Sequence, residues 1–325
     1  MQLKNYVFTT SDNVKLNVNR WLPDAETEIK GVILFHHGLA EHSLRYDRFG
    51  SICAENGYVL NVYDMRGHGK TCELNNAIYG KLADKNGFNR ALQDFEEVKI
   101  SLEKDFEGKK IFLMGHSFGS FILQSYLQSD SESRFSNVAG IAFLGSTGPN
   151  QLIVKPGYVI SSLVRKIKGN DYISNAIYKI IFGSYNNRTK NEKSNFAWLT
   201  TNEFAVQMYE YDEWCGKTLT VSFYNDMIGA LKTIHSRKNL KKVKKDLPLL
   251  ILFGSEDPVS NYGKLIKKLY NIYKKLGVKD MQMKEYIGCR HEVLNEKINE
   301  TVENDIFTWL QTLWISPATT QRFVI

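Results

Sequence analysis

Short hydrophobic runs recur along the chain, and segments with a helical hydrophobic period lie between them. The middle runs are nearly continuous in hydrophobic residues, which is typical of parallel strands covered on both faces. The first two runs are expected to pair as antiparallel strands. The pattern predicts strands at residues 3–9, 16–21, 31–35, 58–63, 110–114, 140–144, 249–253 and 281–287.

Amphipathic segments separate several of these strands. Residues 91–102, 265–276 and 298–313 each place hydrophobic side chains on one helical face. Alternating strands and helices indicate an α/β fold with a mostly parallel, doubly wound sheet.

The alternation stops between about residues 148 and 245. This segment is rich in Tyr, Asn, Lys and Ile, shows helical patches and no convincing strand, and is too long for a loop in a compact domain. We therefore expect a first core segment at 1–147, an inserted helical cap at 148–245 and a second core segment at 246–325.

Composition sets broad limits on the function. The 325 residues are 43% hydrophobic and 24% charged, an ordinary balance for a globular protein. The formal net charge of +7 is explained most simply by a solvated, lysine-rich surface, and the alternative is attraction to an anionic surface such as phospholipid head groups. No nucleic-acid reader motif accompanies the charge, so no nucleic-acid partner is expected.

The sequence also indicates a compartment. Its first residues lack the basic and apolar regions of a signal peptide, and no run of apolar residues is long enough to span a membrane. The four cysteines are scattered, with no C-x-x-C pair, so reduced thiols are expected. These features predict a cytoplasmic protein.

A G-x-S-x-G motif provides a candidate nucleophile, Ser117. The strand predicted at 110–114 runs directly into it, and an apolar helical pattern follows. This arrangement holds a serine on a sharp strand-to-helix turn with its hydroxyl above the sheet, while the helix N-terminus faces a developing oxyanion.

A serine nucleophile needs a base, and the base needs an orienting acid. His291 follows the last predicted strand, and Asp257 follows the strand before it, so both lie at carboxyl ends of strands. The chain order Ser117, Asp257, His291 is the order that a hydrolase elbow requires. Glu256 remains an alternative acid.

Two backbone amides are expected to form the oxyanion hole. Phe118 follows the nucleophile, and Leu39 follows the His37–Gly38 pair at the end of the strand predicted at 31–35. His37 and Gly38 are candidates for close contact with the substrate. No H-E-x-x-H pattern occurs, so neither a metal nor another cofactor is expected.

Several motifs together resemble one branch of the α/β-hydrolase superfamily, the monoacylglycerol lipases and lysophospholipases, which is often grouped with the serine aminopeptidases. The segments FGSYNN, FAWLTTNE, YEYDEWCG and SFYNDMIGAL are similar to the cap of its bacterial members. The core motifs that carry the resemblance are HHGLAEHSLRYDRF, YDMRGHGKT, GHSFGS, GSEDPVS and GCRHEVLNE.

The resemblance implies an α/β-hydrolase fold, the triad and oxyanion hole given above, and a cap that binds an acyl chain. It also implies that the loop from Asp64 to Gly69 is structural support. Phe118 stands where mammalian monoacylglycerol lipases usually carry methionine, which alters the pocket wall and leaves the substrate open.

The cap is expected to select the substrate, with Tyr158, Leu163 and Trp198 as candidate walls. The apolar residues from Tyr158 to Ile167 are flanked by cations, so this helix either packs on the core or lies on a lipid interface. The run of four lysines between Lys241 and Lys245 is interpreted as a solvated hinge.

These features predict a serine hydrolase that cleaves carboxylic esters of one long acyl chain, through an acyl-enzyme on Ser117. The expected partner is a small lipid ester, with peripheral membrane contact through the cap as a further hypothesis. The alternatives are a short-chain carboxylesterase, a peptidase with the same triad, or a hydrolase-fold binding protein without catalysis.

Overall fold

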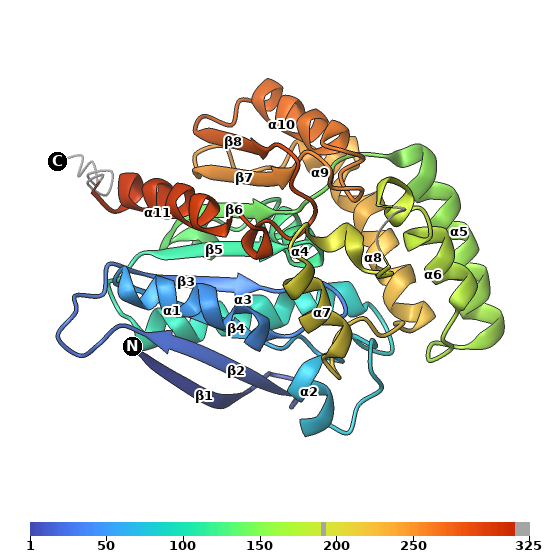
Figure 1. Cartoon of the computed structure of the whole chain (residues 1–325), viewed down its shortest axis with the longest axis horizontal. Coiled ribbons are helices and arrows are strands. Elements are labelled where there is room, and N and C mark those ends of the chain that lie inside the picture. Colours follow the sequence, from blue (N-terminus) through green and yellow to red (C-terminus); the bar gives the residue numbers. More distant parts are fainter. Residues whose placement is uncertain (190–192, 316–325) are drawn as a thin grey trace.

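One eight-stranded sheet organises the molecule (Figure 1), and the computed structural model describes residues 1–189 and 193–315. The strand order is β1-β2-β4-β3-β5-β6-β7-β8. β2 pairs antiparallel with β1 and β4, and all other neighbours are parallel. The strands are β1 (Gln2–Thr9), β2 (Lys15–Leu22), β3 (Gly31–His36), β4 (Tyr58–Tyr63), β5 (Ile111–His116), β6 (Val138–Leu144), β7 (Leu249–Gly254) and β8 (Met281–Tyr286).

Helices connect these strands and cover the sheet. The predicted strands and the three predicted helical segments are confirmed, with boundaries that differ by a few residues. The core helices are α1 (Asp47–Glu55), α2 (Gly69–Leu74), α3 (Gly87–Asp105), α4 (Phe118–Tyr126), α10 (Lys264–Leu276) and α11 (Asn299–Ile315), and the short 3-10 turns are η1 (Ser43–Tyr46), η2 (Glu132–Phe135) and η5 (Val293–Asn295).

The two faces of the sheet have separate hydrophobic cores. Side chains alternate between faces along a strand, so Val32 and Leu34 of β3 join α3, α4 and α10 on one face. Ile33 and Phe35 join α1 and α11 on the other. Because β3, β4, β5 and β7 are buried along their whole length, they read in sequence as continuous hydrophobic runs. The doubly wound α/β-hydrolase fold is confirmed.

The chain leaves the sheet after β6 and returns at β7. The described part of this segment contains no strand of the sheet, and the boundaries proposed at 148 and 245 stay a prediction. Within the segment, α5 packs on α8, and α8 packs on α3 and α4 of the core. Its elements are α5 (Gln151–Lys168), α6 (Asn175–Phe182), η3 (Tyr185–Arg188), η4 (Ala197–Leu199), α7 (Glu203–Tyr211), α8 (Val221–Ile234) and α9 (Arg237–Leu240).

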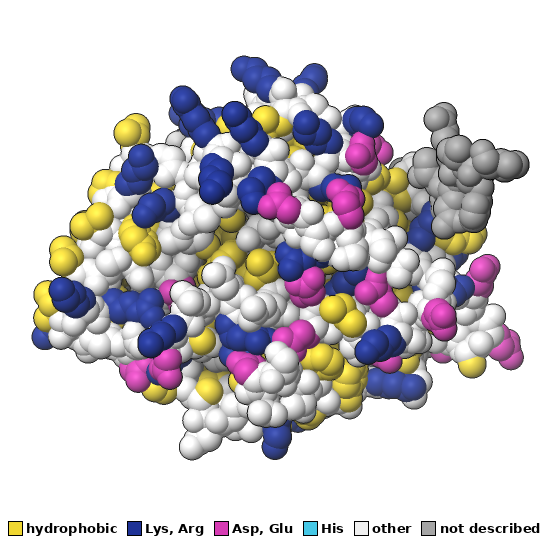
Figure 2. All heavy atoms as spheres, turned by 180° about the vertical axis from the view of Figure 1, so that it is seen from behind, with side chains coloured by type: hydrophobic (Ala, Val, Ile, Leu, Met, Phe, Trp, Pro, Cys, Tyr) yellow, Lys and Arg dark blue, Asp and Glu magenta, His cyan; other side chains and the backbone are white. Residues whose placement is uncertain are grey.

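Charged and hydrophobic side chains are distributed unevenly over the surface. Seen from behind, Lys and Arg side chains gather across the top and upper left, and hydrophobic side chains lie at the left edge, on the side of the cap helices (Figure 2). None of the described helices is both long and apolar enough to cross a membrane.

Candidate active site

Ser117 lies on a strained turn between β5 and α4. Its φ of 49° and ψ of −115° fall outside the regions that a residue with a side chain prefers. Gly119 allows this turn to pack closely, because a Cβ there would lie 2.1 Å from the carbonyl oxygen of His36, the last residue of β3. The turn presents Ser117 to a cavity at the carboxyl ends of the strands.

The structure brings Asp257 and His291 together from the loops after β7 and β8. His291 Nδ1 donates to Asp257 Oδ1 over 3.0 Å, and both residues are almost fully buried. The N–H of Val259 donates to the same carboxylate oxygen at 2.9 Å, which fixes its orientation. A proton on Nδ1 leaves Nε2 of His291 as the acceptor nitrogen, and His291 lines the same cavity as Ser117.

Glu256, the alternative acid, lies elsewhere. Its carboxylate pairs with Arg188 at 3.1 Å on the surface, and its side chain is 41% exposed. It is absent from the hydrogen bonds that the described residues make to His291.

The predicted oxyanion amides flank the nucleophile. Gly38 and Leu39 line the cavity, and a Cβ on Gly38 would lie 3.2 Å from the Cβ of Ser117. The N–H groups of Leu39 and Phe118 have no backbone acceptor among the described residues. His37 is buried and does not line the cavity, because its Nε2 accepts from Met65 N at 2.9 Å and its Nδ1 donates to the carbonyl oxygen of Gly38 at 2.7 Å.

A buried charge cluster lies beneath this loop, and the sequence did not reveal it. Arg45 donates to Glu41 at 2.6 Å and to both carboxylate oxygens of Glu292 at 2.7 and 2.8 Å. Glu41 also accepts from the N–H of Gly38 at 2.6 Å and from His116 Nδ1 at 2.9 Å. The cluster therefore joins the Gly38–Leu39 loop, the elbow and the loop of His291.

Burial and charge act in opposite directions on the pKa values of this cluster. Burial raises the pKa of Glu41, but Arg45 and the hydrogen bond from His116 outweigh it and hold that pKa well below its usual value. Burial also raises the pKa of Glu292, and Arg45 brings it below its usual value. For His116, burial lowers the pKa, but the hydrogen bond and charge of Glu41 raise it above the ordinary value. Both carboxylates are therefore ionised at neutral pH, and His116 holds a proton to a higher pH than an ordinary histidine does.

The same cluster contacts the cap. The N–H of Glu292 donates to the carbonyl oxygen of Leu199 at 2.7 Å. The Tyr209 hydroxyl donates to the carbonyl oxygen of Ala40 at 2.9 Å, and its ring lies 4.7 Å from the Arg45 guanidinium carbon. These contacts fix one end of the cap against the loop that contains Gly38 and Leu39.

Ser117 opens into a cavity of about 410 Å³ with two chemically different ends. The polar end contains Glu41, His116, Tyr209 and Glu292. The apolar end is formed by α5, α6, α8 and the elbow helix, with Phe121, Val154, Ile180, Ile181, Phe182, Met227, Ile228 and Leu231 among its walls.

The predicted cap residues differ in position. Trp198 lines the cavity, and its ring centroid lies 5.2 Å from that of His291. Leu163 does not line it, and 54% of its surface is exposed. Hydrophobic periodicity identified the apolar face of α5 but not the direction in which that face points.

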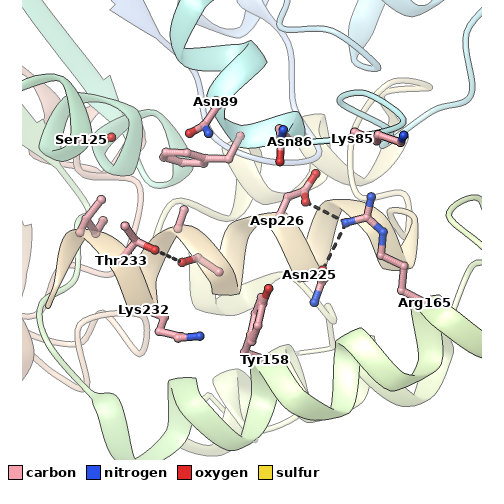
Figure 3. Close-up of a pocket in the computed structure, with 14 residues that line it drawn as sticks. Lys85, Asn86, Asn89, Ser125, Tyr158, Arg165, Asn225, Asp226, Lys232 and Thr233 are labelled. Carbon is pink, nitrogen blue, oxygen red and sulfur yellow. Dashed lines mark hydrogen bonds and ion pairs between the residues drawn. The ribbon is translucent and has the colours of Figure 1, made fainter.

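Tyr158 lies in a second cavity of about 470 Å³, on the other side of α8 (Figure 3). Its ring points from α5 toward α8, and Lys232 Nζ lies 4.3 Å from the ring centroid. Arg165 pairs there with Asp226 at 2.9 Å and with the Asn225 side chain at 3.2 Å. This cavity is polar and holds none of the predicted triad.

Among the described residues, His42, Asp212 and Cys215 form the group that could hold a metal ion, with ligand atoms within 4.8 Å of one another. His42 Nε2 is hydrogen-bonded to Asp212 Oδ2 at 2.8 Å. A metal-bound histidine usually donates its second ring N–H to an acceptor, and the buried Nδ1 of His42 has no partner in the described chain. The group fits a polar contact between core and cap better than a metal site.

Comparison with known proteins agrees with this geometry. Residues 27–298 match the family described as serine aminopeptidase, S33. The chain is 24% identical to the monoglyceride lipase of Saccharomyces cerevisiae over 304 residues, which covers 92% of this chain and 90% of that protein. It is 23% identical to the monoacylglycerol lipase of Mycolicibacterium smegmatis over 309 residues, with coverages of 93% and 95%.

Solved structures give the same result for the fold. A thermostable carboxyl esterase from Bacillus coagulans in complex with glycerol superimposes with a TM-score of 0.86 at 21% identity, covering 97% of this chain and 100% of that chain. The matched family spans most of the chain, including the Ser117 elbow and the loops that carry Asp257 and His291. The chain belongs to the serine aminopeptidase, S33 family of α/β-hydrolases, and it is a serine ester hydrolase.

Proposed function

We propose that this enzyme hydrolyses monoacylglycerols, releasing a fatty acid and glycerol. The observation that carries the proposal is that Ser117 shares one cavity with the polar residues of the charge cluster and with the apolar residues of α5, α6 and α8. A monoacylglycerol has the same division at its ester bond, with a polyol on one side and a hydrocarbon chain on the other. The relatives named as monoglyceride and monoacylglycerol lipases support this substrate class.

In this proposal Ser117, His291 and Asp257 form the catalytic triad. Ser117 Oγ attacks the ester carbonyl carbon while His291 Nε2 accepts the hydroxyl proton. That proton passes to the glycerol oxygen as the ester bond breaks. Water, deprotonated by His291, then hydrolyses the acyl-enzyme and regenerates the serine. Asp257 holds the imidazole by the 3.0 Å hydrogen bond and stabilises its charged form.

The N–H groups of Leu39 and Phe118 are proposed to bind the oxyanion. Phe118 is the first residue of α4, so its amide lacks an intrahelical acceptor and points toward the helix N-terminus. Leu39 follows Gly38, whose own N–H is bound to Glu41 at 2.6 Å. This hydrogen bond restrains the loop before a substrate arrives. N–H donors that are already fixed in place stabilise the negative charge that develops on the carbonyl oxygen during the reaction.

The polar end of the cavity favours a neutral polyol over a phosphate head group. Glu41 and Glu292 line this end with Arg45 as their shared cation, and the described residues that line the cavity include no Lys or Arg that could pair with a phosphate. Lysophospholipids, which carry a phosphate next to the ester, should therefore be poorer substrates than monoacylglycerols of the same chain length.

A substrate panel tests the proposal. We expect purified enzyme to cleave dodecanoylglycerol more efficiently than dodecanoyl lysophosphatidylcholine, p-nitrophenyl acetate or an aminoacyl amide. Ser117→Ala protein serves as the blank, and a fluorophosphonate probe should label wild type but not this variant. Equal efficiency on acetyl and dodecanoyl esters would favour the short-chain esterase, and preferred cleavage of the amide would favour the peptidase.

We also propose that the cap makes peripheral contact with membranes while the enzyme remains in the cytoplasm. In α5 the fully buried side chain is Ser161, whereas Leu152, Ile153 and Ile167 are 90%, 69% and 75% exposed. An apolar face turned to solvent beside Lys166 and Lys168 is typical of an interfacial helix. All four cysteines are free and buried, which supports a reducing compartment.

Flotation with vesicles tests the cap contact. Leu152→Ser/Ile167→Ser protein should bind vesicles less than wild type while its hydrolysis of p-nitrophenyl acetate is unchanged. Unaltered flotation of this variant would contradict contact through the cap.

A further inference from the structure

The charges of this chain are strongly segregated. Residues 237–246 and 264–280 contain twelve Lys or Arg and two Asp, a net charge of +10. The whole chain carries +7, so the remaining residues together carry −3. The basic character of the protein therefore resides in α9, α10 and the segments that follow them.

These two segments form one continuous surface, which we call the basic shoulder. The N–H of Lys279 donates to the carbonyl oxygen of Lys245 at 3.0 Å, which joins the end of one segment to the other. Four cations of the shoulder pair with an acid: Lys242 with Asp130, Lys244 with Glu132, Lys267 with Glu285 and Lys279 with Asp246. The other eight have no acidic partner in the described part of the chain, and all eight are exposed.

The basic shoulder adjoins the exposed apolar part of the cap. Lys268 Nζ donates to the carbonyl oxygen of Pro149 at 3.1 Å, directly before α5 begins. Leu152 and Ile153, both strongly exposed, lie in the first turn of that helix. Gln151 reaches the carbonyl oxygen of Lys232 near the end of α8, at 3.3 Å. Figure 2 shows the same arrangement, with basic side chains next to hydrophobic ones on one side of the molecule.

We infer that the basic shoulder docks the enzyme on membranes that contain anionic phospholipids, with the apolar start of α5 inserted beside it. This inference rests on the proposed cap contact and adds its lipid class and a second contact surface. Lysines near an anionic bilayer are attracted by its surface potential, and apolar residues gain by entering the head-group region. A nucleic acid would use the lysines and leave Leu152 and Ile153 in water, so a lipid surface fits both observations.

Such docking would fix the orientation of the cavity relative to the membrane. The walls of the cavity include Ile153 and Val154 of α5, Ile228 and Leu231 of α8, and Leu265 of α10. The elements that would touch the membrane thus also bound the apolar end of the site. A monoacylglycerol could then pass from the bilayer to Ser117 along these helices.

Vesicle co-sedimentation without any substrate tests the inference. Wild-type protein is mixed with phosphatidylcholine vesicles and with vesicles of equimolar phosphatidylcholine and phosphatidylglycerol. We expect markedly stronger binding to the anionic vesicles, and a steep loss of binding at high salt because added ions screen exposed charges. The variant replaces Lys264, Lys268, Lys274 and Lys275 with glutamine and should lose roughly a hundred-fold or more in partition to anionic vesicles.

A matched variant separates local from total charge. Lys4, Lys15, Lys70 and Lys104 are exposed, and lie on β1, β2, α2 and α3, away from α9 and α10. Replacing these four with glutamine removes the same net charge and should leave binding within about threefold of wild type, because exposed charges that are remote from the contact surface are screened by salt. Both variants should keep the wild-type melting temperature and hydrolyse p-nitrophenyl acetate normally.

The outcomes are distinct. Equal binding of wild type to neutral and anionic vesicles, equal losses in the two variants, or binding to a DNA duplex with none to vesicles would each overturn the inference. If the wild-type enzyme did not hydrolyse monoacylglycerols in the substrate panel, the proposed function would be overturned instead. The two results are independent, since the sedimentation assay contains no substrate.

Discussion

Glu41 and Ile180 line the same cavity, yet they are held in opposite ways. Glu41 is 2% exposed and bonded to a backbone amide, an arginine and a histidine. Ile180 is 65% exposed and lies on the short helix α6. The polar end is fixed by ion pairs between distant parts of the chain, whereas the apolar end is formed by side chains with few directional contacts. We therefore expect the polar end to be the more rigid of the two, and the part of the apolar end that α6 forms to adapt more readily to different acyl chains.

The largest expected effect is on kcat, in variants of the triad that the polar end supports. Ser117→Ala or His291→Ala should each reduce kcat by about a million-fold, with the double variant little worse, as for the subtilisin triad. Asp257→Asn should cost roughly ten-thousand-fold through the wrong histidine tautomer. Steady-state kinetics on dodecanoylglycerol measures both. Glu256→Gln is the control, and near-wild-type activity of Asp257→Asn with an inactive Glu256→Gln would reverse the assignment of the acid.

Arg45→Met tests whether the charge cluster supports the polar end. The change leaves Glu41 and Glu292 buried without their cation, which should lower the free energy of unfolding by about 3–5 kcal/mol. Arg188→Met removes an arginine from an exposed pair with Glu256 and should cost less than about 1 kcal/mol. Denaturant unfolding compares the two. Similar small losses would mean that the buried cluster contributes no more than a surface ion pair.

Acyl-chain selection tests the adaptable end. Each buried methylene contributes about 0.8 kcal/mol, or roughly fourfold in kcat/KM, so efficiency should rise from acetyl to about dodecanoyl and then level off. Ile181→Ser should reduce the ratio of dodecanoyl to butanoyl efficiency by about ten-fold or more, because Ile181 lines the cavity. Leu163→Ser, at an exposed position of α5, should leave this ratio unchanged. A flattened profile in Leu163→Ser would instead place the acyl chain on the outer face of α5.

The smallest effects are expected for the change of the unfolding free energy with pH. The folded-state pKa of Glu41 lies below 4.5, so its stabilisation is complete above pH 4.5 and is lost as pH falls. The folded-state pKa of His116 lies above 6.5, so its stabilisation is complete below pH 6.5 and is lost as pH rises through the folded value. The difference in unfolding free energy between wild type and His116→Asn should therefore shrink from pH 6 toward alkaline pH, by under about 3 kcal/mol. A constant difference across this range would show that His116 does not titrate with Glu41.

The sequence was informative wherever a local pattern had one physical meaning. Continuous hydrophobic runs could be assigned to buried parallel strands, and a strand followed by G-x-S-x-G predicted the elbow at Ser117. The charge cluster was missed because its partners lie 247 residues apart, although Glu41 and Arg45 are four residues apart and Glu292 follows His291 directly. Leu163 shows what the hydrophobic pattern could not predict. Helical period shows which side chains share a face, but the neighbours of that face are determined only by tertiary packing.

The place where the cap is inserted bears on how such enzymes diversify. The chain leaves the sheet after β6 and re-enters it at β7, and these two strands are direct neighbours. A different cap can therefore be inserted at the same place, since its two junctions lie side by side and the order of strands in the sheet does not change. An incoming segment would also have to replace the contacts between cap and core, among them the hydroxyl that Tyr209 donates to the carbonyl of Ala40, the carbonyl that Leu199 offers to the amide of Glu292, and the packing of α8 on α3 and α4. Recombination among relatives could thus change substrate range in one step while the hydrolytic machinery is inherited intact.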